Sequence, residues 1–320
     1  MSGAKSSSAI ATTVEVSRPY RGRFAPSPSG PLHFGSLVAA VASWLEARVR
    51  SGEWLLRIED LDPPREKPGA ADDILAELDR LGLHWDGAVL RQSTRLDAYR
   101  AELDRLAADG LLRNCTCTRA ALAALPENQR RVSGDELYHP PQCLAAAGTP
   151  AAGAARRFLV PDRDVQFVDR VQGLQVINVA RCVGDFLLKR RDGLFAYQLA
   201  VVVDDAEQGI SDIVRGADLL SSTPRQILLQ RALGLPSVTY MHVPLAVGRD
   251  GLKLSKSEDA PGLMLAAPAR QAVAALEFLG QEPPSELARG GVAEVWGWAV
   301  THWHPERVAG LVSRLAPAAL

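Results

Sequence analysis

Two spacings of apolar positions dominate the first part of the chain and predict alternating strands and helices. Residues 21–25, which precede a loop rich in Pro, Ser and Gly, and residues 54–58, an apolar-rich run, are the predicted strands. Between them, apolar side chains recur at helical spacing over residues 37–48, with Ser36 placed to cap this helix and Gly52 to end it. A strand, a helix and a strand in this order predict a parallel sheet with a right-handed crossover.

The same alternation resumes further along the chain, which predicts an α/β fold. The predicted strands cover residues 158–160, 165–177, 186–189, 210–215 and 238–247. The predicted helices cover residues 74–81, 96–106, 223–233 and 258–320, and residues 197–203 are a helix or a buried apolar run.

The composition excludes several classes of protein. Apolar residues make up 47% and charged residues 23% of 320 positions, which is ordinary globular usage, and this length predicts about two domains. The chain has 36 Lys and Arg and 37 Asp and Glu, which gives a formal net charge of −1. Because there is no overall positive charge to attract RNA, any RNA-binding residues must be gathered locally. No segment has the length and apolarity of a membrane span or a secretory signal, and residues 1–17 predict a loose tail. Four cysteines are too few for a disulfide scaffold in a chain of this length. We therefore expect a reduced, cytoplasmic protein without a membrane partner.

A loop rich in Pro, Ser and Gly joins the first predicted strand to the first helix. It lies at the carboxyl edge of the predicted parallel sheet, where such sheets bind ligands. The N-terminus of the helix offers unpaired N–H groups and partial positive charge, which suit a phosphate. Gly30 and Gly35 allow a ligand to approach the backbone, and His33 can donate a hydrogen bond without a full charge.

A second candidate phosphate-binding segment is Lys253-Leu254-Ser255-Lys256-Ser257. Its two lysines lie three positions apart on a loop that follows Gly251, so they can reach one polyphosphate from two sides and close on it during a reaction. A solvated surface loop has the same composition, so this segment is informative only together with the first.

Three of the cysteines form a candidate metal site. Cys115 and Cys117 are separated by one residue, and Cys143 follows further along the chain. Tetrahedral zinc takes four ligands and favours thiolates, so Tyr138 or His139 is needed to complete the set. Three buried thiols without metal are the alternative. Cys182 stands alone in an apolar run, so we expect its thiol to lie in the hydrophobic core.

Together, the two phosphate-binding segments resemble those of class I aminoacyl-tRNA synthetases of the glutamate type. His33-Phe34-Gly35-Ser36 stands at the HIGH element, with Ser36 at the second histidine position, and residues 253–257 resemble the KMSKS loop. The resemblance covers residues 21–265 and includes Arg57-Ile58-Glu59-Asp60-Leu61-Asp62-Pro63, Val201-Val202-Val203-Asp204-Asp205 and Ile213-Val214-Arg215-Gly216-Ala217-Asp218-Leu219-Leu220.

The resemblance implies a fold and a division of the chain. The implied fold is a Rossmann-type parallel sheet with a zinc-binding insertion and a short C-terminal helical region. The expected parts are the tail at 1–17, the first catalytic half at 18–113, the insertion at 114–185, the second catalytic half at 186–260 and the helical region at 261–320.

The resemblance also implies two substrate sites and their chemistry. The implied ATP-binding residues are Pro26, Gly30, His33, Gly35, Ser36, Lys253, Ser255 and Lys256. The implied glutamate-binding residues are Arg23, Phe24, Ala25, Pro26, Ser27, Glu59, Tyr197 and Arg215. ATP comes with Mg²⁺, and His33 and Lys256 are the candidate catalytic residues that stabilise the developing phosphate charge. No general base is needed, because the attacking α-carboxylate is already ionised at neutral pH.

Full glutamyl-tRNA synthetases continue as an anticodon-binding helical domain, whereas residues 258–320 alone follow the lysine loop here. The shortened form resembles the glutamyl-Q tRNA(Asp) synthetase family, which attaches glutamate to queuosine in the anticodon. That resemblance implies ATP, L-glutamate and queuosine-bearing tRNA(Asp) as partners, and no DNA; a monomer is the default expectation. The alternatives are a shortened enzyme that charges the 3′ end of tRNA(Glu), a non-catalytic RNA-binding relic and a different nucleotidylyltransferase acting on a small acid.

The family also implies one structural zinc ion bound by Cys, Cys, Tyr and Cys, with the Tyr four positions before the last Cys. Here Tyr138 is five positions before Cys143 and His139 is four positions before it. The fourth ligand therefore stays open between Tyr138, the residue type of the family, and His139, the commoner zinc ligand of the two.

Overall fold

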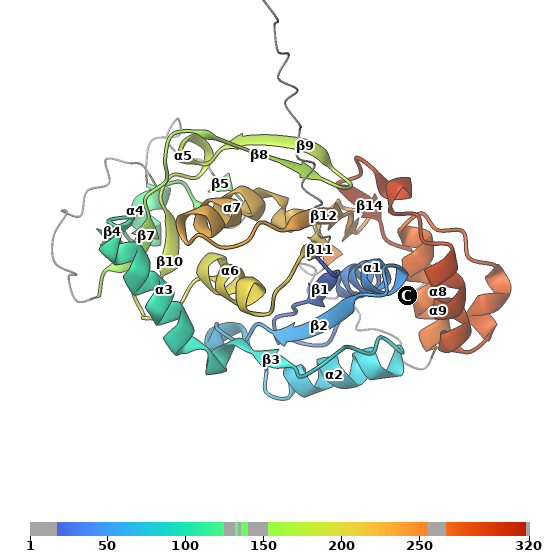
Figure 1. Ribbon diagram of the computed structural model, residues 1–320. Helices are drawn as coiled ribbons and strands as arrows, with labels where there is room; N and C mark the ends of the chain where they lie inside the picture. The colour runs from blue at the N-terminus through green and yellow to red at the C-terminus, as the bar shows by residue number, and fades with distance from the viewer. Residues whose placement is uncertain are drawn as a thin grey trace, which may run out of the picture.

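The computed structural model describes residues 18–124, 132–133, 136–139, 153–251, 253–254 and 267–317. Its centre is a parallel sheet with helices packed around it (Figure 1). In the first half, β1 (Arg21–Phe24), β2 (Glu53–Ile58) and β3 (Leu90–Arg91) pair in parallel in that order. The helix α1 (Phe34–Val49) connects β1 to β2, so the predicted βαβ unit is confirmed.

The second half forms a sheet of order β11-β12-β8-β9. These strands are β11 (Asp212–Gly216), β12 (Thr239–Val243), β8 (Asp164–Asp169) and β9 (Gly173–Asn178). Only the β8–β9 pair is antiparallel in this sheet. The two halves meet along β1 and β11, where the Ser211 N–H donates to the Arg21 carbonyl at 2.9 Å.

A crevice is expected at this junction, because the strand order runs outward in opposite directions from β1 and β11. The helix α6 (Tyr197–Glu207) precedes β11, and α7 (Thr223–Ala232) leads on to β12. Arg23 and Arg215 therefore stand near the carboxyl ends of neighbouring strands, and Glu59 directly follows β2. The topology alone brings three of the predicted glutamate-binding residues to one edge.

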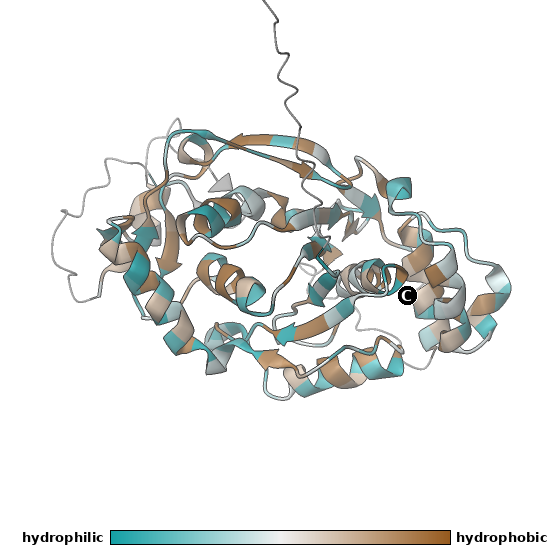
Figure 2. Ribbon diagram, in the orientation of Figure 1, coloured by the Kyte–Doolittle hydropathy of each residue, from teal (hydrophilic) through white to brown (hydrophobic). Residues whose placement is uncertain are grey.

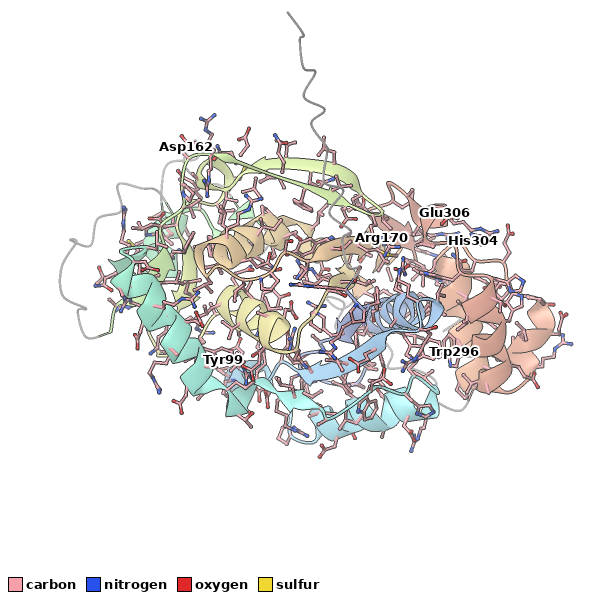
Figure 3. The ribbon with its side chains drawn as sticks, in the orientation of Figure 1. Tyr99, Asp162, Arg170, Trp296, His304 and Glu306 are labelled. Atoms are coloured by element: carbon pink, nitrogen blue, oxygen red, sulfur yellow. The ribbon has the colours of Figure 1, made fainter. Side chains whose placement is uncertain are left out.

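The C-terminal helices pack on α1 (Figure 1). These helices are α8 (Pro268–Phe278) and α9 (Val292–Thr301). Phe34 meets Phe278 edge to face at a centroid distance of 5.5 Å, and Trp44 meets Trp296 at 5.5 Å. Trp296, labelled in Figure 3, also donates to the Leu81 carbonyl at 2.7 Å. The C-terminal region thus shares the hydrophobic core of the first half of the sheet.

A second core lies under an antiparallel sheet of order β10-β7-β4. Its strands are β10 (Phe186–Lys189), β7 (Ala155–Phe158) and β4 (Leu112–Cys115). Figure 2 shows that β10 and most of α6 are hydrophobic. Among the buried polar groups here, the Asp204 carboxylate on α6 accepts from the hydroxyl of Tyr99 (labelled in Figure 3) and from Gln92, each at 2.7 Å. These bonds fasten α6 to the helix that carries Tyr99.

The remaining described elements are short or peripheral. The helices are α2 (Ala70–Arg80), α3 (Leu96–Ala108), α4 (Arg119–Ala123) and α5 (Val179–Cys182). The strands are β5 (Val132–Ser133), β6 (Glu136–Leu137), β13 (Leu245–Val247) and β14 (Ser313–Leu315). The 3₁₀ turns cover Pro63–Arg65, Gln92–Thr94, Ala217–Ser222, Ser285–Arg289 and Pro305–Val308. In this described part of the chain, every helix is too short or too polar to cross a membrane.

Two local expectations were wrong. The N-cap of α1 is His33 rather than Ser36, because the helix begins at Phe34 and the His33 ring accepts a hydrogen bond from the Ser36 N–H. The C-terminal region is not purely helical, because β14 pairs in parallel with β13 and extends the fold by a small two-stranded sheet.

Candidate active site and metal centre

The predicted phosphate-binding loop ends in a histidine held against the start of α1. The Nδ1 of His33 accepts from the Ser36 N–H at 3.2 Å. A side chain at Gly35 would lie 3.0 Å from the His33 ring, so glycine at this position lets the ring stay where it is. Burial lowers the pKa of His33, and the charge of Lys253 lowers it further. The ring is therefore neutral at pH 7, with its proton on Nε2, and acts as a hydrogen-bond donor.

Part of the lysine loop lies beside this histidine. The Lys253 ammonium forms an ion pair with the Asp218 carboxylate at 2.6 Å, and both charges act on the His33 ring. Residues 33 and 253, which are 220 positions apart in the sequence, are therefore close enough for the Lys253 charge to act on the His33 ring. Ser255 and Lys256 lie outside the described residues, so their predicted roles are not tested.

Three of the predicted glutamate-binding side chains, those of Arg215, Glu59 and Arg23, act electrostatically on the hydroxyl group of a fourth, Tyr197. Burial raises the pKa of the Tyr197 phenol, and the charged groups that act on it are those of Arg215, Glu59, Arg23 and Asp205. Arg215 donates from Nη1 to the Tyr197 hydroxyl at 3.1 Å. The fold thus brings charged side chains from β1, the end of β2 and β11 within electrostatic reach of Tyr197 at the start of α6.

Arg23 is held by a residue for which no role had been predicted. Its Nε and Nη2 donate to the two carboxylate oxygens of Asp205 at 3.0 and 3.3 Å. Arg57 donates to the same carboxylate at 2.5 Å and to the Gln208 amide oxygen at 2.7 Å. Burial acts to raise the pKa of Asp205, but the charges of Arg23 and Arg57 outweigh it and hold that pKa low. Asp205 is therefore a carboxylate that fixes both guanidinium groups.

Glu59 lies beside the same arginines, but its carboxylate lacks a hydrogen-bond partner at one oxygen. Its carboxylate is 3.8 Å from the Arg57 Nε, and Oε1 is buried without a hydrogen-bond partner. Burial raises the pKa of Glu59 to about 7, although Arg57 and Arg23 act to lower it. A cation that reached Oε1 would satisfy this carboxylate and favour its ionised form.

The other predicted residues of the loop contribute backbone or packing. Phe24 is buried and stacks on Trp54 at a centroid distance of 6.2 Å. The Pro26 carbonyl accepts from the Glu59 N–H at 3.0 Å, which ties the loop to the end of β2. Ala25 and Gly30 are half-buried, whereas Ser27 is exposed at the rim.

The candidate metal ligands converge within the described residues. One ligand atom each from Cys115, Cys117 and His139 lies within 4.8 Å of the others. The His139 Nε2 is 3.1 Å from the Cys115 sulfur, and its Nδ1 is buried without a partner. Burial lowers the pKa of His139 to about 4, so the ring is neutral and able to ligate. Cys115 is a free thiol, whereas Cys117 is disulfide-bonded, the oxidised form of the thiolate that a metal needs.

The His139 ring belongs to this group, and Tyr138 directly precedes it in the chain. Tyr138 is half-buried with its ring beside Gly184, where an added Cβ would lie 3.3 Å from the ring. Cys143 lies outside the described residues. With Cys117 reduced, two thiolates and one imidazole suit zinc chemically, so the donor set that is described fits the implied metal in its reduced form.

One further expectation was wrong. Cys182 is exposed at the end of the short helix α5, so it is not a core thiol.

Comparison with known proteins agrees with this geometry. Residues 20–262 match the family described as tRNA synthetases class I (E and Q), catalytic domain. A glutamyl-Q tRNA(Asp) synthetase from Dechloromonas aromatica is 53% identical over 95% of this chain and 100% of its own length. A glutamyl-Q tRNA(Asp) synthetase from Pseudomonas aeruginosa is 54% identical over 90% of this chain and 95% of its own length.

A solved structure supports the fold. A glutamate tRNA ligase from Elizabethkingia meningosepticum superimposes with a TM-score of 0.76 at 24% identity, over 93% of this chain and 67% of the ligase chain. The sequence matches and the converging site residues lead to one assignment. The chain belongs to the class I tRNA synthetases of the glutamate and glutamine type and, within them, to the glutamyl-Q tRNA(Asp) synthetase family.

Proposed function

We propose that this protein activates glutamate with ATP and transfers the glutamyl group to queuosine in the anticodon of tRNA(Asp). The observation that carries the proposal is that Arg215 donates to the Tyr197 hydroxyl, on which the charges of Arg23 and Glu59 also act. Glutamate has two carboxylates and one ammonium, and this site offers two guanidinium groups and one carboxylate.

The charges suggest how glutamate is oriented. Arg23 and Arg215 bind its two carboxylates, and the Tyr197 hydroxyl binds the side chain. Glu59 accepts the α-ammonium, which supplies the cation that its buried Oε1 otherwise lacks. Selection against glutamine follows because a guanidinium binds a carboxylate more strongly than a neutral amide.

In the first step, the α-carboxylate of glutamate attacks the α-phosphorus of ATP. A P–O bond forms, the bond to the bridging oxygen breaks, and glutamyl-adenylate and pyrophosphate result. Mg²⁺ bound to ATP would supply positive charge that offsets the charge of the phosphates. The neutral His33 donates from Nε2 to a phosphate oxygen, and Lys256 stabilises charge that develops in the transition state.

In the second step, a hydroxyl of the queuosine cyclopentenediol attacks the activated carbonyl and AMP leaves. This acceptor is inferred from relatives named glutamyl-Q tRNA(Asp) synthetase that match over nearly their whole length. A tRNA acceptor also implies a cytoplasmic reaction. We propose that the protein acts as a monomer and that the shortened glutamyl-tRNA synthetase and the relic are the weaker alternatives.

We infer that a structural zinc ion would be bound by Cys115, His139 and the reduced thiolate of Cys117, with Cys143 as the further ligand. Bound zinc would supply a covalent-like cross-link between β4 and the segment that carries His139. Because the four-position spacing to Cys143 and the proximity to Cys115 both favour His139, we assign it, rather than Tyr138, as the fourth ligand.

Glutamate-dependent ATP–pyrophosphate exchange, measured with and without tRNA, tests the first step. We expect exchange with glutamate and no added tRNA, and little exchange with glutamine. Exchange that requires tRNA(Glu) would favour the shortened glutamyl-tRNA synthetase. An absence of exchange in both reactions, with folded and zinc-loaded protein, would favour the non-catalytic relic.

A further inference from the structure

A buried aspartate and histidine lie directly behind Arg215. The Nε of Arg215 is 3.0 Å from the Nε2 of His242, and the Nδ1 of His242 is 2.6 Å from the Oδ2 of Asp169. Both His242 and Asp169 have fully buried side chains, at 0% exposure each. His242 lies on β12 and Asp169 on β8, and both are outside the motifs that resemble those of the synthetases.

The hydrogen bonds of Asp169 fix which nitrogen of His242 carries the proton. Burial lowers the pKa of His242 to about 4, against the opposing effect of Asp169, so its ring is neutral. Burial acts to raise the pKa of Asp169, but its bonds to His242 and to backbone N–H groups hold it low. A carboxylate accepts only, so Nδ1–H must donate to Asp169, and Nε2 is left as an acceptor.

The acceptor at Nε2 in turn orients the guanidinium of Arg215. With Nε–H donating to His242 and Nη2 donating to the Thr223 hydroxyl at 2.9 Å, the plane of the guanidinium is set from two sides. Nη1 then donates to the Tyr197 hydroxyl, on which the charges of Glu59 and Arg23 also act.

We propose that the Asp169–His242 pair is a positioning device that holds Arg215 in the orientation that selects glutamate over glutamine. This inference deepens the proposed function and rests on glutamate being the substrate. Asp169 and His242 do not touch the substrate, so they act through Arg215. Their effect should fall on recognition of the glutamate side chain more than on the chemical step.

The variant Asp169→Asn tests this with a minimal change of shape. The Oδ1 of Asp169 accepts from three backbone N–H groups, those of Val171 at 3.0 Å, Gln172 at 2.9 Å and His242 at 3.2 Å. These donors require an oxygen, so the new amide nitrogen must face His242 and donate to Nδ1. The proton of His242 then moves to Nε2, where it opposes the Nε–H of Arg215.

In ATP–pyrophosphate exchange, Asp169→Asn should raise the KM for glutamate by about tenfold or more, as the loss of one hydrogen bond to a charged group predicts. The kcat should change little, and the preference for glutamate over glutamine should fall. Gln172→Ala is the matched control, because it removes bonds from the same turn to the carbonyls of His242 (2.9 Å) and Leu311 (2.8 Å). It should lower thermal stability and leave the KM for glutamate unchanged.

A folded Asp169→Asn variant with an unchanged KM for glutamate would overturn the proposal, and so would an equal rise in the Gln172→Ala control. The ¹⁵N spectrum of the wild-type His242 ring supplies a readout independent of activity. We expect a protonated Nδ1 and an unprotonated Nε2; a proton on Nε2 would overturn the proposal even if the variant failed to fold. If the wild-type protein lacked glutamate-dependent exchange, the proposed function would fail, and this spectrum would still decide whether the pair orients Arg215.

Discussion

Replacing Asp205 with asparagine should destabilise the protein far more than an ordinary surface change. The Asp205 side chain is 3% exposed and balances Arg23 and Arg57, whose side chains are 3% and 0% exposed. In Asp205→Asn, two buried cations would remain with Glu59, 3.8 Å from the Arg57 Nε, as the nearest acid. Breaking a buried ion pair by removing one partner costs about 3–5 kcal/mol, a large part of the roughly 5–15 kcal/mol by which proteins are stable.

Urea unfolding followed by tryptophan fluorescence measures this change, since the chain contains 6 Trp. The matched control is Asp97→Asn, which breaks an exposed ion pair with Arg100 (side chains 95% and 57% exposed) and should cost less than about 0.5 kcal/mol. The lowered pKa of Asp205 means that its contribution is present at neutral pH and is lost as the pH falls through that pKa, so the variant should lose less stability in acid. A loss of stability below about 1 kcal/mol at neutral pH would refute the reasoning, because it would mean that the arginines do not need this carboxylate.

Three further predictions concern catalysis, pH and metal. Lys256→Ala should lower the kcat of ATP–pyrophosphate exchange with little change in the KM for glutamate, because its charge acts mainly in the transition state; a rise in KM alone would contradict that role. The kcat/KM for glutamate should fall as the pH falls through about 7, because protonation removes the Glu59 carboxylate, and Glu59→Gln should abolish this inflection; an inflection that persists must belong to another group. Gly184→Ala should lower both thermal stability and zinc content measured by elemental analysis, because its Cβ would lie 2.0 Å from the His139 carbonyl oxygen at a φ of +74°; normal values for both would argue against a metal site at His139.

The alternation of strands and helices was readable from the sequence because it is local. The helix α1 and the strands β2 and β10 follow directly from apolar spacing, and the structure confirms them together with the predicted strand β1. Errors occurred where a single side chain or a very short element decides the outcome. The ring of His33 replaced Ser36 as the cap of α1, and β14 is too short to show any periodicity.

The candidate glutamate-binding residues were predicted by their motifs, whereas no role was predicted for the residues that hold them. Asp205 lies 148 positions from Arg57, and His242 lies 73 positions from Asp169. The second contact exists because β8 pairs beside β12, an order of strands that no local pattern reveals. The useful signal was chemical: Asp204 and Asp205 end the apolar run of α6, and buried acids imply buried partners.

The central claim is tested most directly by the acceptor of the glutamyl group. The protein is incubated with ATP, radiolabelled glutamate and tRNA(Asp) from which the 3′-terminal adenosine has been removed, with either queuosine or guanosine in the anticodon. We expect label on the tRNA that carries queuosine and none on the tRNA that carries guanosine. Label that requires the terminal adenosine, irrespective of queuosine, would contradict the account and identify an enzyme that charges the 3′ end.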